Sequence, residues 1–316
     1  MNTPDAGTPA AGATAPKAEI SPRAGPRMPQ AKPMPKIEHP TVEALRMFLR
    51  NPSAIVGLVI LVFVVLVAVA GPWVYEADPF EIRAAPLTPP GTADAWLGSD
   101  YLGRDVLTML IYGGRATLIV GAVAAFLSVL IGITLGAFAG YYGGKVDSWL
   151  MRVTEFFQVL PALLFAMVLV TLFPPTLLTI TLAIGIVSWP GTARLTRAEF
   201  MKFRGLEFVR AERAIGARHA RILWAVILPN ALPPLVVSAS LAVGAAILFA
   251  AGLQFLGLGD PNQMSWGLML GSSRPYVLSC WWAVAIPGAA IFITVLAVSL
   301  IGDGLNDAMN PKLRER

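Results

Sequence analysis

The sequence predicts an all-α integral membrane protein with six transmembrane helices. Its 316 residues are 56% hydrophobic and only 14% charged, whereas an average soluble domain is about 25% charged. The mean hydropathy is +0.66. A spanning helix needs roughly 20 mainly apolar residues, and five stretches free of charge, apart from Glu76 at the end of the first, are long enough. These stretches are residues 51–76, 116–144, 156–193, 222–259 and 275–302.

The third stretch is long enough for two helices. Pro174 and Pro175 lie near its middle, and two adjacent prolines cannot continue a helix. We therefore expect two short helices joined by a tight turn at this point. The six predicted spans are residues 54–75, 117–141, 157–173, 176–189, 235–255 and 282–301.

The predicted membrane domain comprises residues 51–310, and a tail lies on each side of it. The first forty residues contain nine prolines and no apolar run, which predicts a disordered N-terminal tail over residues 1–50 and no cleaved secretory signal. Residues 311–316 form a short C-terminal tail. Cys280 is the single cysteine, so neither an intramolecular disulfide nor a cysteine-rich zinc site is expected.

The basic residues predict the orientation. Seven precede the first span, two lie in 142–156, eight in 191–234 and three after 301, which leaves four for the opposite face. Loops rich in Lys and Arg stay in the cytoplasm, so both termini are expected there. The net charge of +5 then reflects the orientation of the chain in the membrane. A nucleic-acid surface would need these residues on a folded soluble module, and none is apparent.

Two segments deserve separate interpretation. Residues 76–115 are expected to form an external loop. Residues 192–231 are expected on the cytoplasmic side as two short helices, at 207–213 and 217–226, with Gly216 between them.

The cytoplasmic segment carries a recognisable pattern. Its residues 207–216 read Glu-Phe-Val-Arg-Ala-Glu-Arg-Ala-Ile-Gly, and residues 227–230 read Ile-Leu-Pro-Asn. This resembles the EAA loop of ABC-importer permeases, with the family's spacing between the glycine and the Leu-Pro pair. The triplet is Arg-Ala-Glu instead of Glu-Ala-Ala, so the acid stands third. The resemblance implies that the loop contacts an ATPase through Glu207, Arg210, Ala211, Glu212, Gly216, Leu228 and Pro229.

Other blocks narrow the resemblance to the dipeptide and oligopeptide branch. Residues 97–105 read Leu-Gly-Ser-Asp-Tyr-Leu-Gly-Arg-Asp, which is similar to an external motif of that branch. Residues 140–144, 256–259 and 265–267 also match, and the start of the chain after residue 50 resembles the C-type subunit. The external motif residues are Gly98, Asp100, Gly103, Arg104 and Asp105.

The resemblance implies a type I ABC importer permease fold with a cytoplasmic coupling helix, in a bacterial or archaeal inner membrane. It implies a second homologous permease subunit, two ATP-binding subunits that hold Mg-ATP, and an extracytoplasmic solute-binding protein. Di- or oligopeptides are the expected solutes, and nickel complexes, glutathione or oligosaccharides are the alternatives. The chain itself would be no enzyme and bind no cofactor.

The residues present agree with a transporter that has no catalytic site. A phosphate-binding Gly-Lys-Ser/Thr motif is absent, because Gly144-Lys145 is followed by Val146. The predicted spans contain no interior charged residue, which disfavours an ion-coupled carrier, the rival interpretation. Their polar side chains fit either helix contacts or a solute path. These are Ser128, Thr134, Gln158, Thr179, Thr181, Ser188, Ser238, Ser240, Gln254 and Thr294.

Overall fold

The computed structural model describes residues 45–92 and 95–309, and this part of the chain is helical with three isolated β-bridges. Most of the expected N-terminal tail and the C-terminal tail, residues 1–44 and 310–316, lie outside the described residues. The expected boundary at residue 50 is wrong, however. Residues 45–48 form a helical turn, and Phe48 is buried against Ala54 and Ala308.

Five helical segments are long and apolar enough to cross a membrane, and a bent pair of helices makes a sixth. Each has an expected counterpart in the sequence. Four of the five are α2 (Pro52–Val74), α3 (Val106–Tyr142), α6 (Leu177–Arg204) and α11 (Trp282–Met309). The fifth joins α8 (His219–Arg221), η1 (Ile222–Ile227), α9 (Leu228–Leu253) and η2 (Gln254–Leu258).

The expected third span, residues 157–173, is not one straight helix. Helix α4 (Gly144–Val159) and helix α5 (Ala162–Thr171) meet at an angle of 84°. Pro161 follows Leu160, whose backbone is extended at φ −77° and ψ 130°. Proline disfavours the helical conformation in the residue before it, which explains the break. The predicted turn at Pro174–Pro175 is confirmed, because α5 ends before it and α6 begins after it.

Other prolines do not end helices. Helix α6 continues through Pro190 to Arg204, so the expected loop 192–231 begins with helix, and the expected span 176–189 is too short. Before Pro229 the backbone widens into the π-helix η1, where the Leu228 N–H bonds to the Leu223 carbonyl. A π-turn lets a helix continue past a proline, which has no backbone N–H to donate. Pro229 therefore lies inside a continuous helical segment.

Helices α3 and α6 lie closely together along a row of glycines. A methyl group added at Gly132 would lie 2.6 Å from the Thr192 Cβ, and one at Gly140 would lie 2.6 Å from the Arg197 carbonyl oxygen. Gly136, between them, approaches the backbone of Ala193 as closely. The spacing by four places these glycines on one helix face, and this crowded interface lies within the subunit.

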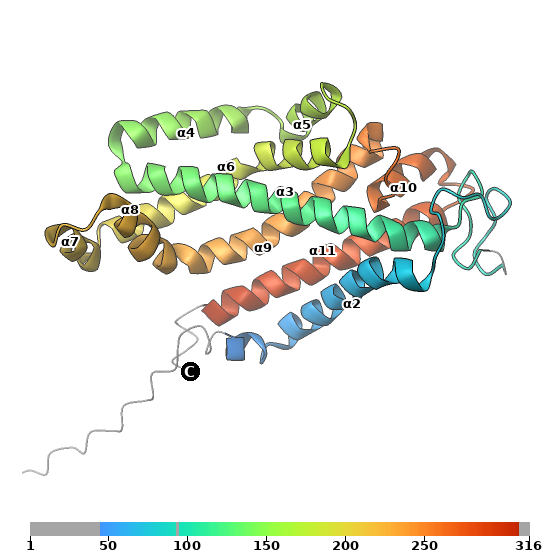
Figure 1. The fold of residues 1–316 in the computed structure, drawn as a ribbon, viewed down its shortest axis with the longest axis horizontal. Coiled ribbons are helices and arrows are strands. Elements are labelled where there is room, and N and C mark those ends of the chain that lie inside the picture. Colours follow the sequence, from blue (N-terminus) through green and yellow to red (C-terminus); the bar gives the residue numbers. More distant parts are fainter. Residues whose placement is uncertain (1–44, 93–94, 310–316) are drawn as a thin grey trace, which may run out of the picture. The chain divides into compact units, whose positions relative to one another are not determined.

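The helices have two ends with different neighbours (Figure 1). The α7 end carries α7 (Glu207–Ala214), the start of α2 and the last turns of α11. There the Asn51 side-chain amide donates a hydrogen bond of 3.0 Å to Asp307. The opposite end carries α10 (Trp266–Ser273), the 3-10 turn η3 (Arg274–Tyr276) and the long loop, residues 75–105. Because α3 begins at Val106, this loop is shorter than the expected 76–115.

Candidate functional site

Helix α7 is a short amphipathic helix that ends in a glycine cap. Gly216 has φ +79°, and its N–H bonds to the Arg213 carbonyl while the Ala217 N–H bonds to the Glu212 carbonyl. This pair of bonds is a Schellman motif, which requires a left-handed residue at the glycine position. Space is not the constraint, since an added Cβ at Gly216 meets no atom within 4 Å. The predicted helix, glycine bend and second helix are present.

One side of α7 is anchored to the helix bundle. Val209 is fully buried in a cluster with Phe200 of α6 and with Ile222, Leu223 and Ile227 of η1. The second predicted short helix thus merges with the segment that leads into α9. Leu228 and Pro229 follow directly as the first residues of α9.

Tyr141 ties the end of α3 to the same region. Its hydroxyl lies 2.8 Å from Nδ1 of His219, the first residue of α8. The Arg213 guanidinium lies 5.3 Å from the Tyr141 ring centroid, within cation–π range. The Tyr141 carbonyl accepts a hydrogen bond of 3.2 Å from Arg204 at the end of α6. Tyr141 of α3 thus contacts the chain on both sides of Gly216, and Arg204 of α6 helps to hold the end of α3 in place.

The other side of α7 faces outward. Phe208 and Ile215 are 40% and 79% exposed, and Glu207, Arg210 and Ala211 are exposed as well. Positions 208, 211 and 215 lie three and four residues apart, on one helical stripe. Of the predicted loop residues, the structure thus places Glu207, Arg210 and Ala211 on an exposed face with an apolar stripe.

Glu212 points the other way. Its carboxylate Oε2 is buried without a hydrogen bond in the described part of the chain and lies 3.9 Å from Nε of Arg221. At that distance the contact is an ion pair without hydrogen-bond geometry. The acid of the Arg-Ala-Glu triplet therefore pairs inside the subunit, and the basic Arg210 occupies the outward face.

At the opposite end, the predicted motif residues build the long loop. Asp100 is fully buried and accepts hydrogen bonds from the backbone of Leu102 and Arg104, and its Oδ2 lies 2.6 Å from Nη2 of Arg104. Asp105 caps α3 by accepting bonds from the N–H and hydroxyl of Thr108, at 2.9 and 2.6 Å. Gly98 and Gly103 have φ of +83° and +86°, where glycine is strongly favoured. All five predicted residues are structural parts of one loop.

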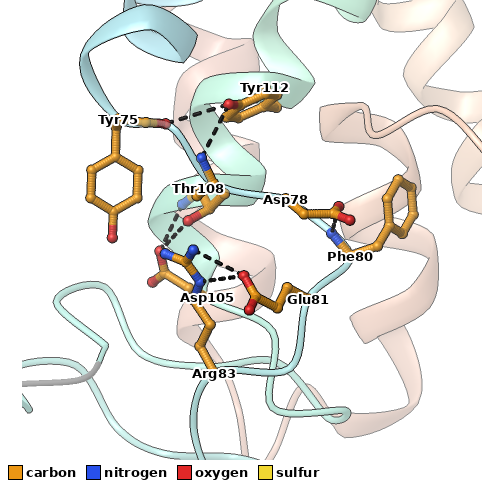
Figure 2. A network of polar contacts seen from close by, with 9 residues as sticks. Tyr75, Asp78, Phe80, Glu81, Arg83, Asp105, Thr108 and Tyr112 are labelled. Carbon is orange, nitrogen blue, oxygen red and sulfur yellow. Dashed lines mark hydrogen bonds and ion pairs between the residues drawn. The ribbon is translucent and has the colours of Figure 1, made fainter.

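The long loop is held from two sides. The Ser99 carbonyl accepts bonds from Trp282 Nε1 at 3.0 Å and from the Cys280 thiol at 3.4 Å. Figure 2 shows the second attachment, where the Tyr112 hydroxyl of α3 lies between the Tyr75 carbonyl and the backbone after it. The exposed Arg83–Glu81 pair belongs to the same network (Figure 2).

Two features escaped the sequence analysis. The Tyr141–His219 contact joins residues 78 positions apart, and the only signal was the position of Tyr141 in the glycine-flanked block 140–144. A cavity between α3, α6 and α9 depends on the packing of three separate helices. In the described residues, no group of three His, Cys, Asp or Glu side chains is placed to hold a metal ion.

Comparison with known proteins decides the family. Residues 132–315 match the family described as "Binding-protein-dependent transport system inner membrane component". The chain belongs to this family. Residues 39–90 match "N-terminal TM domain of oligopeptide transport permease C".

Relatives of this transport permease match it over nearly their whole length. It is 41% identical to the di/tripeptide transport system permease protein DppC of Pseudomonas aeruginosa, over 90% of this chain and 97% of the relative. It is 44% identical to the dipeptide transport system permease protein DppC of Escherichia coli K12, over 87% and 94%. With the oligopeptide transport system permease protein OppC of Bacillus subtilis it shares 35%, over 86% and 90%.

The permease fold also matches a solved structure. A chain of the MetNI methionine ABC transporter, in an inward-facing conformation, superposes with a TM-score of 0.55 at 20% identity. The match covers 64% of this chain and 96% of that chain. The fold is therefore that of an ABC importer permease, and the permease is a multi-pass membrane protein.

Proposed function

We propose that this permease forms half of the translocation pathway of an ATP-driven importer for di- or oligopeptides. The observation that carries the substrate class is the 41% and 44% identity, over about nine tenths of the chain, to permeases named for di/tripeptides and dipeptides. A second permease subunit, two ATP-binding subunits and an extracytoplasmic binding protein complete the transporter.

Helix α7 is the coupling helix in this proposal. The buried Val209 holds one side of α7 against the bundle, and the contact of Tyr141 with His219 holds the segment that follows α7. Helix α7 is thereby a stiff extension of α3, α6 and α9. Its outward side presents Phe208 and Ile215 beside Arg210. Apolar side chains that are exposed to solvent mark interaction sites. A stiff, packed element transmits a rigid-body motion of the bound ATPase to the helices.

The α7 end is assigned to the cytoplasm. Eight basic residues lie in 191–234, and the start of α2 and the end of α11 lie at the same end. The long loop at the opposite end carries Arg83 and Arg104 only, and each of these pairs with an acid. The excess of basic residues at one end favours cytoplasmic termini.

Co-purification tests the coupling assignment. The complete transporter is expressed with native permease or with Ile215→Asp, and the ATP-binding subunits retained with the permease are quantified. Burying an aspartate in an apolar contact is costly, so we expect at least a tenfold loss of affinity, which corresponds to about 1.4 kcal/mol.

Ile82→Asp is the matched control, because Ile82 is 67% exposed and lies in the long loop at the opposite end. The control should retain the ATP-binding subunits as the native permease does. Equal retention in Ile215→Asp and Ile82→Asp would show that the exposed stripe of α7 is not the docking surface.

A further inference from the structure

A cavity of about 380 Å³ lies where α3, α6 and α9 converge. This volume falls within the range of about 300–1,000 Å³ that small-molecule sites occupy. Small residues such as Ala124, Gly191 and Ala245 line most of it, and no charged residue is among its lining residues. Four hydroxyl groups complete the lining, those of Ser128, Ser188, Thr192 and Ser238.

These four hydroxyls share an unusual property. Within the described residues, none of them donates to or accepts from another protein group. Ser128 and Thr192 are nevertheless only 3% and 6% exposed. Their oxygens open onto the cavity, because the buried side-chain atoms without a hydrogen bond in the described residues are Glu212 Oε2 and Ser273 Oγ. An occupant that covered these hydroxyls without bonding to them would cost about 1–3 kcal/mol for each, since buried polar groups are nearly always hydrogen-bonded.

Other hydroxyls in the spanning helices α6 and α11 behave differently. Thr181, Thr196 and Thr294 each donate to the carbonyl four residues earlier in their own helix, at 2.6, 2.8 and 2.7 Å. This internal bond is the usual solution for a hydroxyl in a membrane helix. The cavity hydroxyls leave their donors and acceptors free for something that enters the cavity.

We infer that this cavity is the solute-contact site of the permease, and that Ser128, Ser188, Thr192 and Ser238 bind the backbone amide groups of a passing peptide. The inference rests on the proposed function and names the residues that carry it out. Amides both donate and accept hydrogen bonds, as hydroxyls do. Without a fixed charge, the site can exchange hydrogen bonds with peptides of different side chains without selecting one.

Two other occupants fit the chemistry less well. A lipid acyl chain offers no hydrogen-bonding group, and an apolar helix of the partner subunit has its backbone groups already paired. Either would leave buried hydroxyls unsatisfied. The experiment below detects either occupant. A lipid chain or a helix in the cavity would keep a water-soluble reagent out, and added peptide would not change the labelling.

Cysteine labelling tests the occupant. In the complete transporter, Ser188→Cys introduces an exposed thiol, while the native Cys280 of this chain is buried and serves as an internal blank. The rate of labelling by a small cationic methanethiosulfonate is measured on this chain with and without millimolar alanyl-alanine. We expect a rapid reaction that alanyl-alanine slows at least fivefold.

Ser299→Cys is the control, because Ser299 lies half-buried in α11, outside the cavity lining. Alanyl-alanine should leave its labelling rate unchanged. No labelling at Ser188→Cys would mean that lipid or a helix fills the cavity, and labelling that the dipeptide leaves unchanged would mean that no peptide binds there. Either result overturns the inference.

Transport measurements give an independent readout. Uptake of radiolabelled alanyl-alanine into proteoliposomes is compared for Thr192→Val, which removes only the hydroxyl, and Thr192→Ser, which keeps it. We expect at least a tenfold loss in the valine variant and less than a twofold loss in the serine variant, with the ATP-binding subunits still assembled with the permease in both. Equal uptake in both variants overturns the inference alone, whereas a native transporter that takes up no dipeptide overturns the proposed function.

Discussion

The hydroxyl of Tyr141 lies 2.8 Å from Nδ1 of His219, which joins the last turns of α3 to the segment that follows the Gly216 bend. The same ring lies under the Arg213 guanidinium at the end of α7. A displacement of α7 is therefore resisted by contacts on both sides of the bend. This arrangement makes α7 part of the helix bundle and not a flexible tether.

Removing the Tyr141 hydroxyl should weaken this connection. Tyr141→Phe keeps the ring and its contact with Arg213 but loses one hydrogen bond, so the free energy of unfolding should fall by about 1 kcal/mol. Thermal unfolding of the purified transporter measures the change. Tyr142→Phe is the matched control, because that neighbouring, 49% exposed tyrosine makes no hydrogen bond within the part of the chain that the structure describes. Equal effects of the two substitutions would contradict the assigned contact.

The buried pair of the long loop should matter far more than the exposed one. Asp100→Ala leaves Arg104, whose side chain is 10% exposed in the native structure, without its carboxylate, which should cost about 3–5 kcal/mol. Glu81→Ala breaks the exposed pair with Arg83 and should cost far less, because solvent screens this pair. Denaturation of the two variant transporters compares the losses. A similar loss in both would mean that the Asp100–Arg104 pair does not hold the loop together.

The close approach of α3 and α6 predicts opposite effects for one substitution at two glycines. Gly136→Ala forces a methyl group against the Ala193 backbone and should destabilise the protein by about 1–3 kcal/mol. Gly252→Ala, in α9, meets no atom within 4 Å and should stabilise it by up to about 1 kcal/mol, since alanine favours helix. Melting temperatures that shift in the same direction would refute the packing.

The single native thiol should react slowly. Cys280 is 1% exposed, and burial raises the pKa of its thiol above the usual range. The reactive thiolate therefore forms only at higher pH, and maleimide labelling at neutral pH should be roughly tenfold or more slower than for an exposed thiol. Leu278→Cys provides that reference, because Leu278 is 98% exposed and only two residues away. Comparable labelling rates at residues 278 and 280 would show that the packing around Cys280 is open.

The spans could be predicted from the sequence because hydropathy is a strong, local signal. Proline was less informative. Pro174–Pro175 ends a helix as expected, whereas Pro190 and Pro229 lie within helices, because a π-turn or neighbouring helices can satisfy the freed carbonyls. Pro161 also stands in an apolar stretch, but the bend of 84° between α4 and α5 at this proline was not predicted. Proline marks where a helix can break, and packing decides whether it does.

The candidate sites could be predicted only as sets of residues. The pattern around Gly216 identified the segment, but which side chains face outward depends on where Val209 finds its cluster. The inward direction of Glu212 depends on Arg221 of the next helix. Three of the cavity hydroxyls, those of Ser128, Ser188 and Ser238, were among the ten candidate polar residues, whereas Thr192 was not. Only the crossing of three helices separates the cavity hydroxyls from hydroxyls that bond within their own helix.

Coupling between ATP hydrolysis and uptake tests the central claim most directly. The measurement is the amount of alanyl-alanine imported per ATP hydrolysed by the complete transporter with loaded binding protein, for native permease, Gly216→Asn and Gly216→Pro. Asparagine tolerates the left-handed conformation and should behave as native. Proline fixes φ near −65° and lacks the N–H that bonds to Arg213, so ATP hydrolysis should lose its stimulation although the subunits assemble. Native stimulation and import in Gly216→Pro would contradict the role of α7 as the coupling helix.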